Sequence, residues 1–195
     1  MTAMDAQTDL RNRQAFKRFN FYMLWLWRLG FRRWINCWPR PGGRVMVITH
    51  TGRRSGLRRR TPVNYALIGD DLYCVAGFGQ VSDWFRNIQA NSQVELWLPD
   101  SWWAGTAQDI SSDPNRLYLV RQVLLSTGMV ASLYGIDPRK MSEAALDQAT
   151  ADYRLVRFRR TSRLTGRGGP GDLAWVWIPV SLAALLLYLA SRRLR

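Results

Sequence analysis

The chain has 195 residues, enough for one domain with a hydrophobic core, and its apolar fraction of 47% excludes wholesale disorder. The formal net charge is +14, concentrated in residues 10–69, which hold fourteen Lys or Arg and no Asp or Glu. Two distant cysteines, Cys37 and Cys74, exclude a disulfide framework, and the single histidine, His50, argues against zinc sites and Ser-His-Asp catalysis.

The concentrated positive charge predicts an anionic partner: nucleic acid, acidic lipid headgroups or a phosphorylated small molecule. Arg exceeds Lys by 26 to 2, which favours bidentate contacts with phosphate or carboxylate, although GC-rich coding produces the same bias. No known nucleic-acid recognition motif is present, and the basic residues are interleaved with aromatic ones as at a membrane surface. We therefore expect no nucleic-acid partner.

Residues 1–41 are predicted to form a basic-aromatic amphipathic helix. Their first ten residues are polar and acidic, which does not resemble a cleavable signal peptide. Pro39 and Pro41 are expected to end the helix. The apolar run Phe19–Trp27 is too short to span a bilayer, but Arg and aromatic side chains suit the headgroup region of a membrane. The alternative is a helix packed on the protein's own core.

Residues 42–164 are predicted to form one mainly β domain. The expected strands are Arg44–His50, Pro62–Ile68, Leu72–Ala76, Val94–Leu98, Trp102–Ile110 and Tyr153–Phe158. A tight turn is expected at residues 69–71 and a short helix at Asp83–Ala90. Residues 113–149 are helical in pattern, with Asp113 as the N-cap and Pro114 at the first helical position. Strands joined by short turns, with a helical insertion, predict a small barrel.

Residues 165–172 form a Gly-rich linker, and residues 173–195 are predicted to be a membrane segment with a basic tail. Leu173–Ala190 contains no charged residue, and its 18 residues lie at the lower limit for a membrane span. Trp175, Trp177 and Tyr188 lie near its ends, as interface anchors do. Basic residues are denser before this segment, which places the main domain on the cytoplasmic face. Alternatively, residues 173–177 complete the soluble domain and the remainder lies on the membrane.

The residues with the clearest chemistry lie within Thr51–Tyr65. Two glycines allow a tight turn, and Arg53, Arg54 and Arg59, with Ser55, supply donors for a phosphate or a carboxylate. The GxxxxGK[ST] pattern is absent, so this is not the phosphate loop of nucleotide hydrolases. Taken alone, the segment predicts an anion site of unknown ligand or a solvated basic turn.

The run GRRSGLRRRTPVNY, followed by GDDLYCVAGFGQVSDWFRNIQANSQVELWL, resembles the deazaflavin-dependent nitroreductase and quinone reductase family over residues 42–98. TGRGGPGDLAWVW is similar to the tail of a membrane-associated branch. The resemblance implies an α+β, mainly β fold: a split β-barrel of the FMN-binding-like type with peripheral helices and a C-terminal apolar helix. It also implies a bacterial oxidoreductase that uses reduced coenzyme F420, without a metal, to reduce quinones, nitro compounds or enones.

By position, the resemblance assigns cofactor contacts to three stretches of this chain. They are Arg53, Arg54, Ser55, Arg59, Arg60, Thr61, Pro62, Val63 and Asn64; Val75, Ala76, Gly77 and Phe78; and Asp83, Trp84, Phe85, Arg86 and Asn87. The first three residues and Arg59 would meet the phosphate and the oligoglutamate tail of the cofactor.

Two tyrosines match less specific parts of the family pattern. Tyr65 is a candidate proton donor, and Tyr134 is a candidate on the substrate side. Gly77-Phe78 and Ser82 depart from the pattern, which predicts altered access for a small lipophilic substrate. These departures leave a second hypothesis open, a non-catalytic protein of the same fold that binds F420 or a fatty acid. Related split barrels commonly form homodimers.

Overall fold

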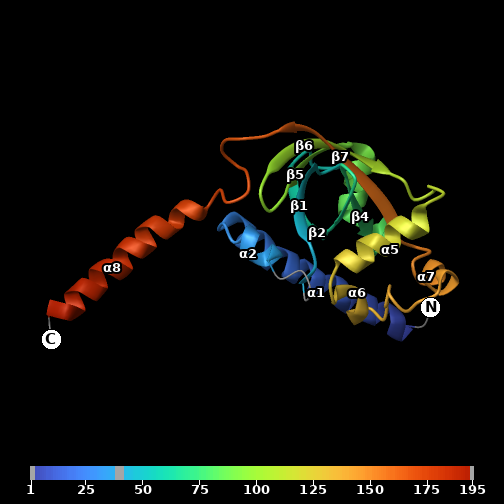
Figure 1. Ribbon diagram of the computed structural model, residues 1–195, viewed down its shortest axis with the longest axis horizontal. Helices are drawn as coiled ribbons and strands as arrows, with labels where there is room; N and C mark the ends of the chain where they lie inside the picture. The colour runs from blue at the N-terminus through green and yellow to red at the C-terminus, as the bar shows by residue number, and fades with distance from the viewer. Residues whose placement is uncertain (1–2, 38–41, 194–195) are drawn as a thin grey trace.

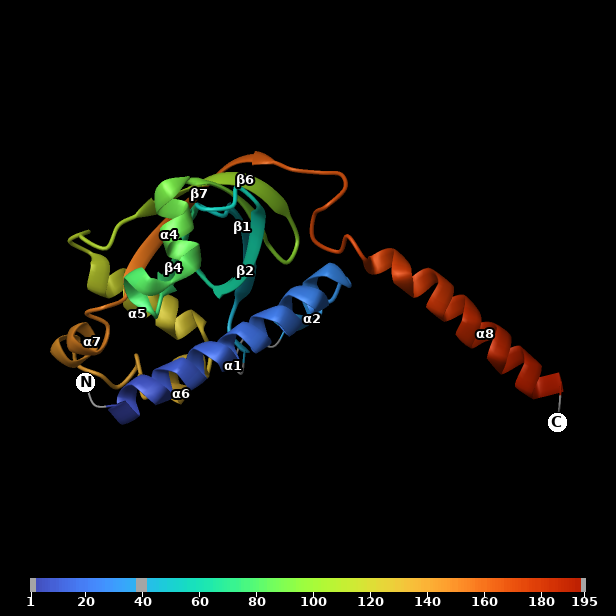
Figure 2. The same cartoon turned by 180° about the vertical axis from the view of Figure 1, so that it is seen from behind.

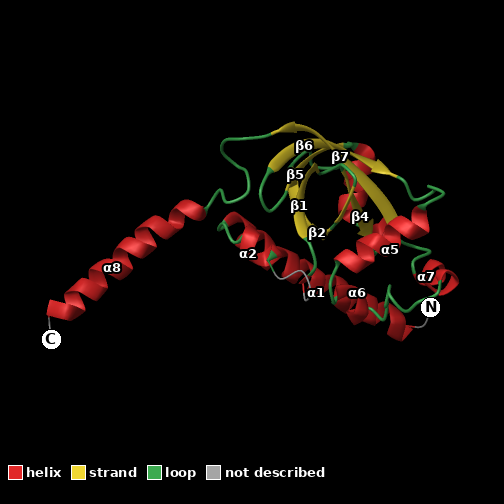
Figure 3. Ribbon diagram, viewed as in Figure 1, coloured by secondary structure: helices red, strands yellow, loops and turns green. Residues whose placement is uncertain are grey.

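The computed structural model of the protein describes residues 3–37 and 42–193. Seven antiparallel strands form one curled sheet in the order β2-β1-β5-β6-β7-β4-β3 (Figure 1). The strands are β1 (Val45–Thr51), β2 (Arg58–Asn64), β3 (Ala66–Ile68), β4 (Asp71–Ala76), β5 (Gln93–Trp97), β6 (Trp102–Asp109) and β7 (Arg154–Arg163). The curled sheet surrounds an inner core (Figure 3), which is the arrangement of a split β-barrel.

Helices surround this sheet. The α-helices are α1 (Ala3–Arg28), α2 (Arg32–Asn36), α4 (Asp83–Ala90), α5 (Arg116–Ser126), α6 (Val130–Leu133), α7 (Glu143–Ala149) and α8 (Trp177–Arg193), with 3-10 turns η1 (Gly79–Val81) and η2 (Ala174–Val176). Figure 1 shows α1 running along one side of the barrel and α8 projecting away from it. Figure 2, the view from the opposite side, shows α4 lying against the barrel.

Alternation along β1 separates an inner core from an outer one. Met46 and Ile48 are fully buried in the inner core, together with Phe85 of α4, so α4 fills part of the barrel interior. Val47 points to the other face and packs with Trp27 of α1 and with Trp97. A fully buried Trp contributes a large apolar area, and α1 therefore belongs to the fold and is not merely an appendage.

The structure confirms most of the predicted strands and corrects two details. The run expected as one strand, Pro62–Ile68, is divided into β2 and β3, and β2 begins earlier, at Arg58. The division falls at Tyr65, whose N–H donates to the carbonyl of Arg44 and whose carbonyl accepts from the Ser126 hydroxyl. Because these bonds satisfy the backbone outside the sheet ladder, the chain changes direction here.

Two helix boundaries also differ from the sequence prediction. Asp113 is not the N-cap of α5, because the helix begins at Arg116 and Asn115 occupies the N-cap position. The Asp113 carboxylate instead accepts the N–H of Asn115 at 2.8 Å, in the turn before the helix. The N-terminal helix is interrupted at Gly30, where φ is +96°. Pro39 and Pro41, which were expected to end it, lie outside the described residues.

The apolar C-terminal helix is present. Residues Ala174–Arg192 form a helical segment of 19 residues with a mean hydropathy of 1.8, none of which is buried inside the protein. Its length and composition are sufficient to cross a membrane.

Candidate functional site

The Arg-rich segment forms a tight hairpin loop between β1 and β2. Gly52 donates its N–H to the carbonyl of Leu57 at 2.9 Å, and Gly56 donates to the carbonyl of Gly52 at 2.8 Å. Gly56 has φ +66°, a conformation that glycine adopts at low cost. The loop leaves Arg54 and Ser55 exposed. Their donors are therefore accessible to an anionic ligand.

Helix α4 is fixed to this hairpin by one buried amide. The side-chain oxygen of Asn87 accepts from the backbone N–H of Arg53 at 3.1 Å and from its guanidinium at 3.0 Å. The same guanidinium donates to Asp83 at 3.1 Å. The Asn87 amide nitrogen lies 3.2 Å from Nδ1 of His50, and Nε2 of His50 lies 3.1 Å from the Thr61 hydroxyl. We call these five residues the Asn87 network.

The network determines the protonation of His50. Because the Asn87 oxygen faces Arg53, its NH₂ group donates to Nδ1 of His50, and the imidazole proton is assigned to Nε2, which donates to Thr61. The pKa of His50 is lowered from 6.5 to about 4; burial is the largest cause, the positive charge of Arg59 adds to it, and Asp83 partly opposes both. His50 is therefore neutral at pH 7. No pattern in the sequence indicated that His50 lies in the site.

The buried, neutral His50 predicts acid sensitivity. Between pH 6.5 and about 4 the unfolded chain binds a proton at this residue that the folded chain does not bind, so the free energy of unfolding falls as the pH falls. The expected loss from this residue is about 3 kcal/mol at pH 4. Urea unfolding across this range should show a steeper loss for the wild type than for His50→Gln. Parallel profiles would contradict the prediction.

Strand β2 places adjacent arginines on opposite faces. Arg59 is opposite His50 in the register, and Thr61 is opposite Ile48, so both lie on the inner face of the sheet. Arg60 lies on the outer face, where its guanidinium stacks 4.7 Å from the Trp97 ring and donates to the carbonyl of Gly168. The structure therefore separates Arg60 from Arg59, although the resemblance assigned both to the cofactor.

Several other assigned side chains are held by the protein itself. Phe85 and Ala76 are buried in the inner core, and Pro62 is buried as well. Val63 packs against the inner core and Val75 against the core under α5. The Asn64 amide donates to the carbonyls of Gly42 and Arg44. The side chains of Phe85, Ala76 and Pro62 are therefore buried, while those of Val63, Asn64 and Val75 are partly accessible. However, β2 is an edge strand, and its second side carries backbone groups that no neighbouring strand pairs within the described sheet.

Tyr65 lies in the same inner core. Its side chain is 8% exposed, and burial raises the pKa of its phenol. The structure therefore places this candidate proton donor within the barrel and away from solvent.

The loop after β4 brings a second group of assigned residues together. The rings of Phe78 and Phe16 meet edge to face, with their centroids 5.7 Å apart. The centroid of the Tyr134 ring lies 6.3 Å from that of Phe16. Burial raises the pKa of both Tyr134 and Tyr153, and Tyr134 raises that of Tyr153 further. We call Phe16, Phe78, Tyr134 and Tyr153 the aromatic cluster. Phe16, from α1, was not predicted, because no spacing in the sequence connects it to Phe78.

The remaining residues that the resemblance assigned to the cofactor lie between the end of β4 and α4. Gly77, at the end of β4, is exposed beside the Tyr153 ring. The Arg86 guanidinium donates to the carbonyl of Gln80 at 2.7 Å and so fixes η1 to α4. Trp84 contacts the ring of Phe85 and is only partly buried. Residues 77–83 thus connect the aromatic cluster directly to the Asn87 network.

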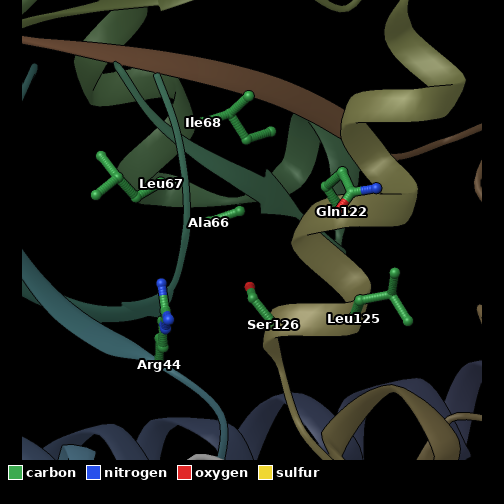
Figure 4. Close-up of a pocket in the computed structure, with 7 residues that line it drawn as sticks. All are labelled: Arg44, Ala66, Leu67, Ile68, Gln122, Leu125 and Ser126. Carbon is green, nitrogen blue, oxygen red and sulfur yellow. The ribbon is translucent and has the colours of Figure 1, made fainter. Parts of the chain in front are cut away.

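A separate surface pocket of about 310 Å³ lies between β3 and α5 (Figure 4). It is lined by Arg44, Ala66, Leu67, Ile68, Gln122, Leu125 and Ser126. None of the assigned cofactor residues lines it. Within the described residues, no three His, Cys, Asp or Glu side chains gather in a group that could hold a metal ion.

The protein is a split barrel with exposed arginines on an edge hairpin beside α4, an arrangement whose donors suit an anionic ligand. The family model described as F420H(2)-dependent quinone reductase matches residues 36–134. The chain belongs to this F420H2-dependent quinone reductase family.

Several solved structures are similar to this chain at low sequence identity and with TM-scores below 0.5. One, described as an F420-H2 dependent reductase (FDR-A), is 18% identical over 59% of this chain and 93% of its own, with a TM-score of 0.45. Another, described as an F420 reductase, is 18% identical over 65% and 93%, with a TM-score of 0.42. The heme storage protein HutZ from Vibrio cholerae is 11% identical over 73% and 93%, with a TM-score of 0.45. Comparison with curated proteins gives no match.

Proposed function

We propose that this protein transfers hydride from F420H2 to a lipophilic acceptor such as a quinone or a nitro compound. The observation that carries the proposal is the direct connection, through residues 77–83, between the Asn87 network and the aromatic cluster. One side supplies cations for an anionic cofactor, and the other supplies an apolar aromatic surface. An F420H2-dependent reductase needs both sides within reach of one flat ring.

The residues of the hairpin fit the cofactor that the family uses. Arg54, Ser55 and Arg59 are exposed donors, suited to a phosphate and a chain of carboxylates. Arg53 is held in place by Asn87 and Asp83, so its backbone orientation is set before a ligand binds. The edge of β2 offers backbone donors and acceptors to the polar margin of a ring. When bound, the reduced deazaflavin supplies the hydride.

The aromatic cluster favours a flat apolar acceptor. Tyr134 is 45% exposed, and because burial raises its pKa, its hydroxyl keeps the proton at neutral pH. It can therefore donate a hydrogen bond to an acceptor oxygen that becomes negative during reduction. Tyr153 has the same raised pKa and lies beside Gly77. In this proposal Tyr134 takes the proton-donor role for which Tyr65 was the candidate in the sequence analysis.

We also propose that α8 attaches the protein to the cytoplasmic face of a membrane, which would supply lipophilic acceptors. Its apolar length and the Trp175 and Trp177 rings at its start support insertion. The basic residues of the preceding domain support a cytoplasmic orientation. A homodimer, which is common in split barrels, is a further part of the proposal, and the mass of the detergent-solubilised protein tests it.

The full-length protein in detergent should oxidise F420H2 when menadione or a nitroaromatic compound is added. The loss of reduced cofactor is followed by absorbance, and Tyr134→Phe should lower kcat more than it raises KM. Arg139→Ala, which changes an exposed residue outside both groups, is the matched control. Binding of F420H2 without oxidation by any acceptor would support a carrier role instead. Absence of F420H2 binding would refute both the reductase and the carrier role.

A further inference from the structure

The outward face of the N-terminal helices carries a set of exposed aromatic side chains. The side chains on the inward face of α1 include the fully buried Trp27, which packs on the barrel. On the opposite face, Phe21 is 58% exposed, Tyr22 67% and Trp25 42%, and Trp34 of α2 is 63% exposed. The Phe21 ring contacts those of Tyr22 and Trp25 at 5.7 and 6.2 Å. Monomeric soluble proteins rarely leave such a contiguous apolar patch uncovered.

Cations surround these rings. Lys17, Arg18 and Arg33 are exposed, and the guanidinium of Arg28 lies 5.5 Å from the centre of the Trp25 ring. Residues 10–69 contain no acidic residue, so these cations have no acidic neighbour within their own segment, although Arg28 pairs with Asp172 from the linker. Aromatic rings with Lys and Arg are the composition of segments that lie in the headgroup layer of a bilayer. A second copy of the same face would instead bring like charges together.

The segment that leads into α8, and its first residue Trp177, are fixed to the C-terminal end of α1. Arg28 donates from two nitrogens to the Asp172 carboxylate, at 3.0 to 3.2 Å. The Asp172 side chain is 14% exposed, so the pair is partly desolvated. The backbone of Leu173 donates to the carbonyl of Arg28 at 2.9 Å, and the Trp177 indole donates to the carbonyl of Leu29 at 2.9 Å. We call this set of contacts the α1–α8 latch.

Two further contacts strengthen the latch. Arg32 donates to the carbonyls of Pro99 and Pro170 and so ties α2 both to the barrel and to the linker. Gly30 allows the close approach of η2, because an added Cβ would lie 3.3 Å from that of Ala174. The direction of α8 is therefore coupled to the orientation of α1. In both views α8 leaves the barrel on the side of α1 and points away from the sheet (Figures 1 and 2).

We infer that the outward face of α1 and α2 is a second membrane-binding surface, which lies in the headgroup layer of an acidic phospholipid bilayer while α8 enters the same bilayer. The inference rests on the proposed attachment through α8. The latch holds the two surfaces at one relative angle. Phe16, which contacts Phe78 and Tyr134, lies on the same helix, so the membrane-binding surface and the aromatic cluster share one element.

The test places an environment-sensitive nitrobenzoxadiazole label at single exposed cysteines in full-length protein with Cys37→Ser, in which the remaining native cysteine, Cys74, is fully buried. Tyr22→Cys probes α1, Leu186→Cys probes α8, and Gln93→Cys, at an exposed position on β5, is the control. Vesicles of phosphatidylglycerol and phosphatidylcholine carry spin-labelled lipid quenchers at the headgroup or deep in the chains. We expect headgroup quenching at Tyr22→Cys to be at least three-fold stronger than at Gln93→Cys, and deep quenching at Leu186→Cys.

The outcomes separate this inference from the attachment through α8. Deep quenching at Leu186→Cys with an unquenched label at Tyr22→Cys would overturn the α1 surface and leave the anchor standing. Absence of quenching at both Tyr22→Cys and Leu186→Cys would overturn both the α1 surface and the attachment through α8. Shielding of the Tyr22→Cys label in detergent without lipid would indicate a second copy as the occupant and would also overturn the inference. Adding Asp172→Asn should at least halve quenching at Tyr22→Cys and leave Leu186→Cys unchanged.

Discussion

Arg59→Ala should weaken F420H2 binding by about 10- to 100-fold, because a hydrogen bond to a charged group contributes about 1.5–3 kcal/mol. Arg58→Ala should change the affinity by less than about three-fold, because this side chain lies on the opposite face of β2 and pairs with Glu95. Both variants remove one positive charge from adjacent positions. The comparison therefore separates a directed contact from the general electrostatic attraction of the hairpin.

The measurement is a fluorescence titration with F420H2 at two salt concentrations. For both variants, the thermal midpoint should remain near that of the wild type, since both residues are exposed. The prediction would be wrong if Arg58→Ala and Arg59→Ala lowered the affinity equally at low salt and neither lowered it at high salt. The hairpin would then attract the cofactor by its net charge, without a specific arginine ligand.

Asn87→Ala should be the most destabilising single change in the site. It leaves the buried imidazole nitrogen of His50 and the backbone N–H of Arg53 without their partner, at a cost of about 3 kcal/mol. For a chain of this size that corresponds to a fall of roughly 6–12 °C in Tm. Because the hairpin loop loses its attachment to α4, the affinity for F420H2 should fall as well.

Asn91→Ala is the matched control for this prediction. Asn91 is the exposed C-cap of the same helix, and among the residues that the structure describes its side-chain oxygen accepts the N–H of Gln93 alone. Calorimetry should show a loss below about 1 kcal/mol for this variant, as for other surface substitutions. If Asn87→Ala were no more destabilising than Asn91→Ala, the Asn87 network would not hold the hairpin to α4.

Much of this protein could be predicted from local patterns. Runs of β-branched and apolar residues predicted most of the strands, and the amphipathic run Asp83–Ala90 predicted α4 with the bounds that the structure shows. The uncharged run after residue 172 predicted the apolar helix, because hydrocarbon length and composition are properties of consecutive residues. The arginines and glycines of the loop predicted the tight hairpin turn that the structure shows, and the anion site that they also suggested stays a prediction.

The tertiary structure decided which of these residues act together. Whether Arg59 or Arg60 faces a ligand depends on the register between β1 and β2, which no local pattern specifies. Tyr65 satisfied the family pattern, but the end of β2 places its ring inside the barrel. His50 gained a role only because folding brings α4, 37 positions further along the chain, to its Nδ1 atom.

The sequence by itself therefore determined the elements, the basic hairpin and the membrane-like composition of both ends, since each depends on neighbouring residues. Only the tertiary structure decided that Phe16 meets Phe78, that Asn87 holds Arg53, and that Asp172 fixes α8 to α1. These contacts join segments far apart in the chain. Their partners are selected by packing and by the requirement that buried polar groups be paired, and neither condition can be read from a linear pattern.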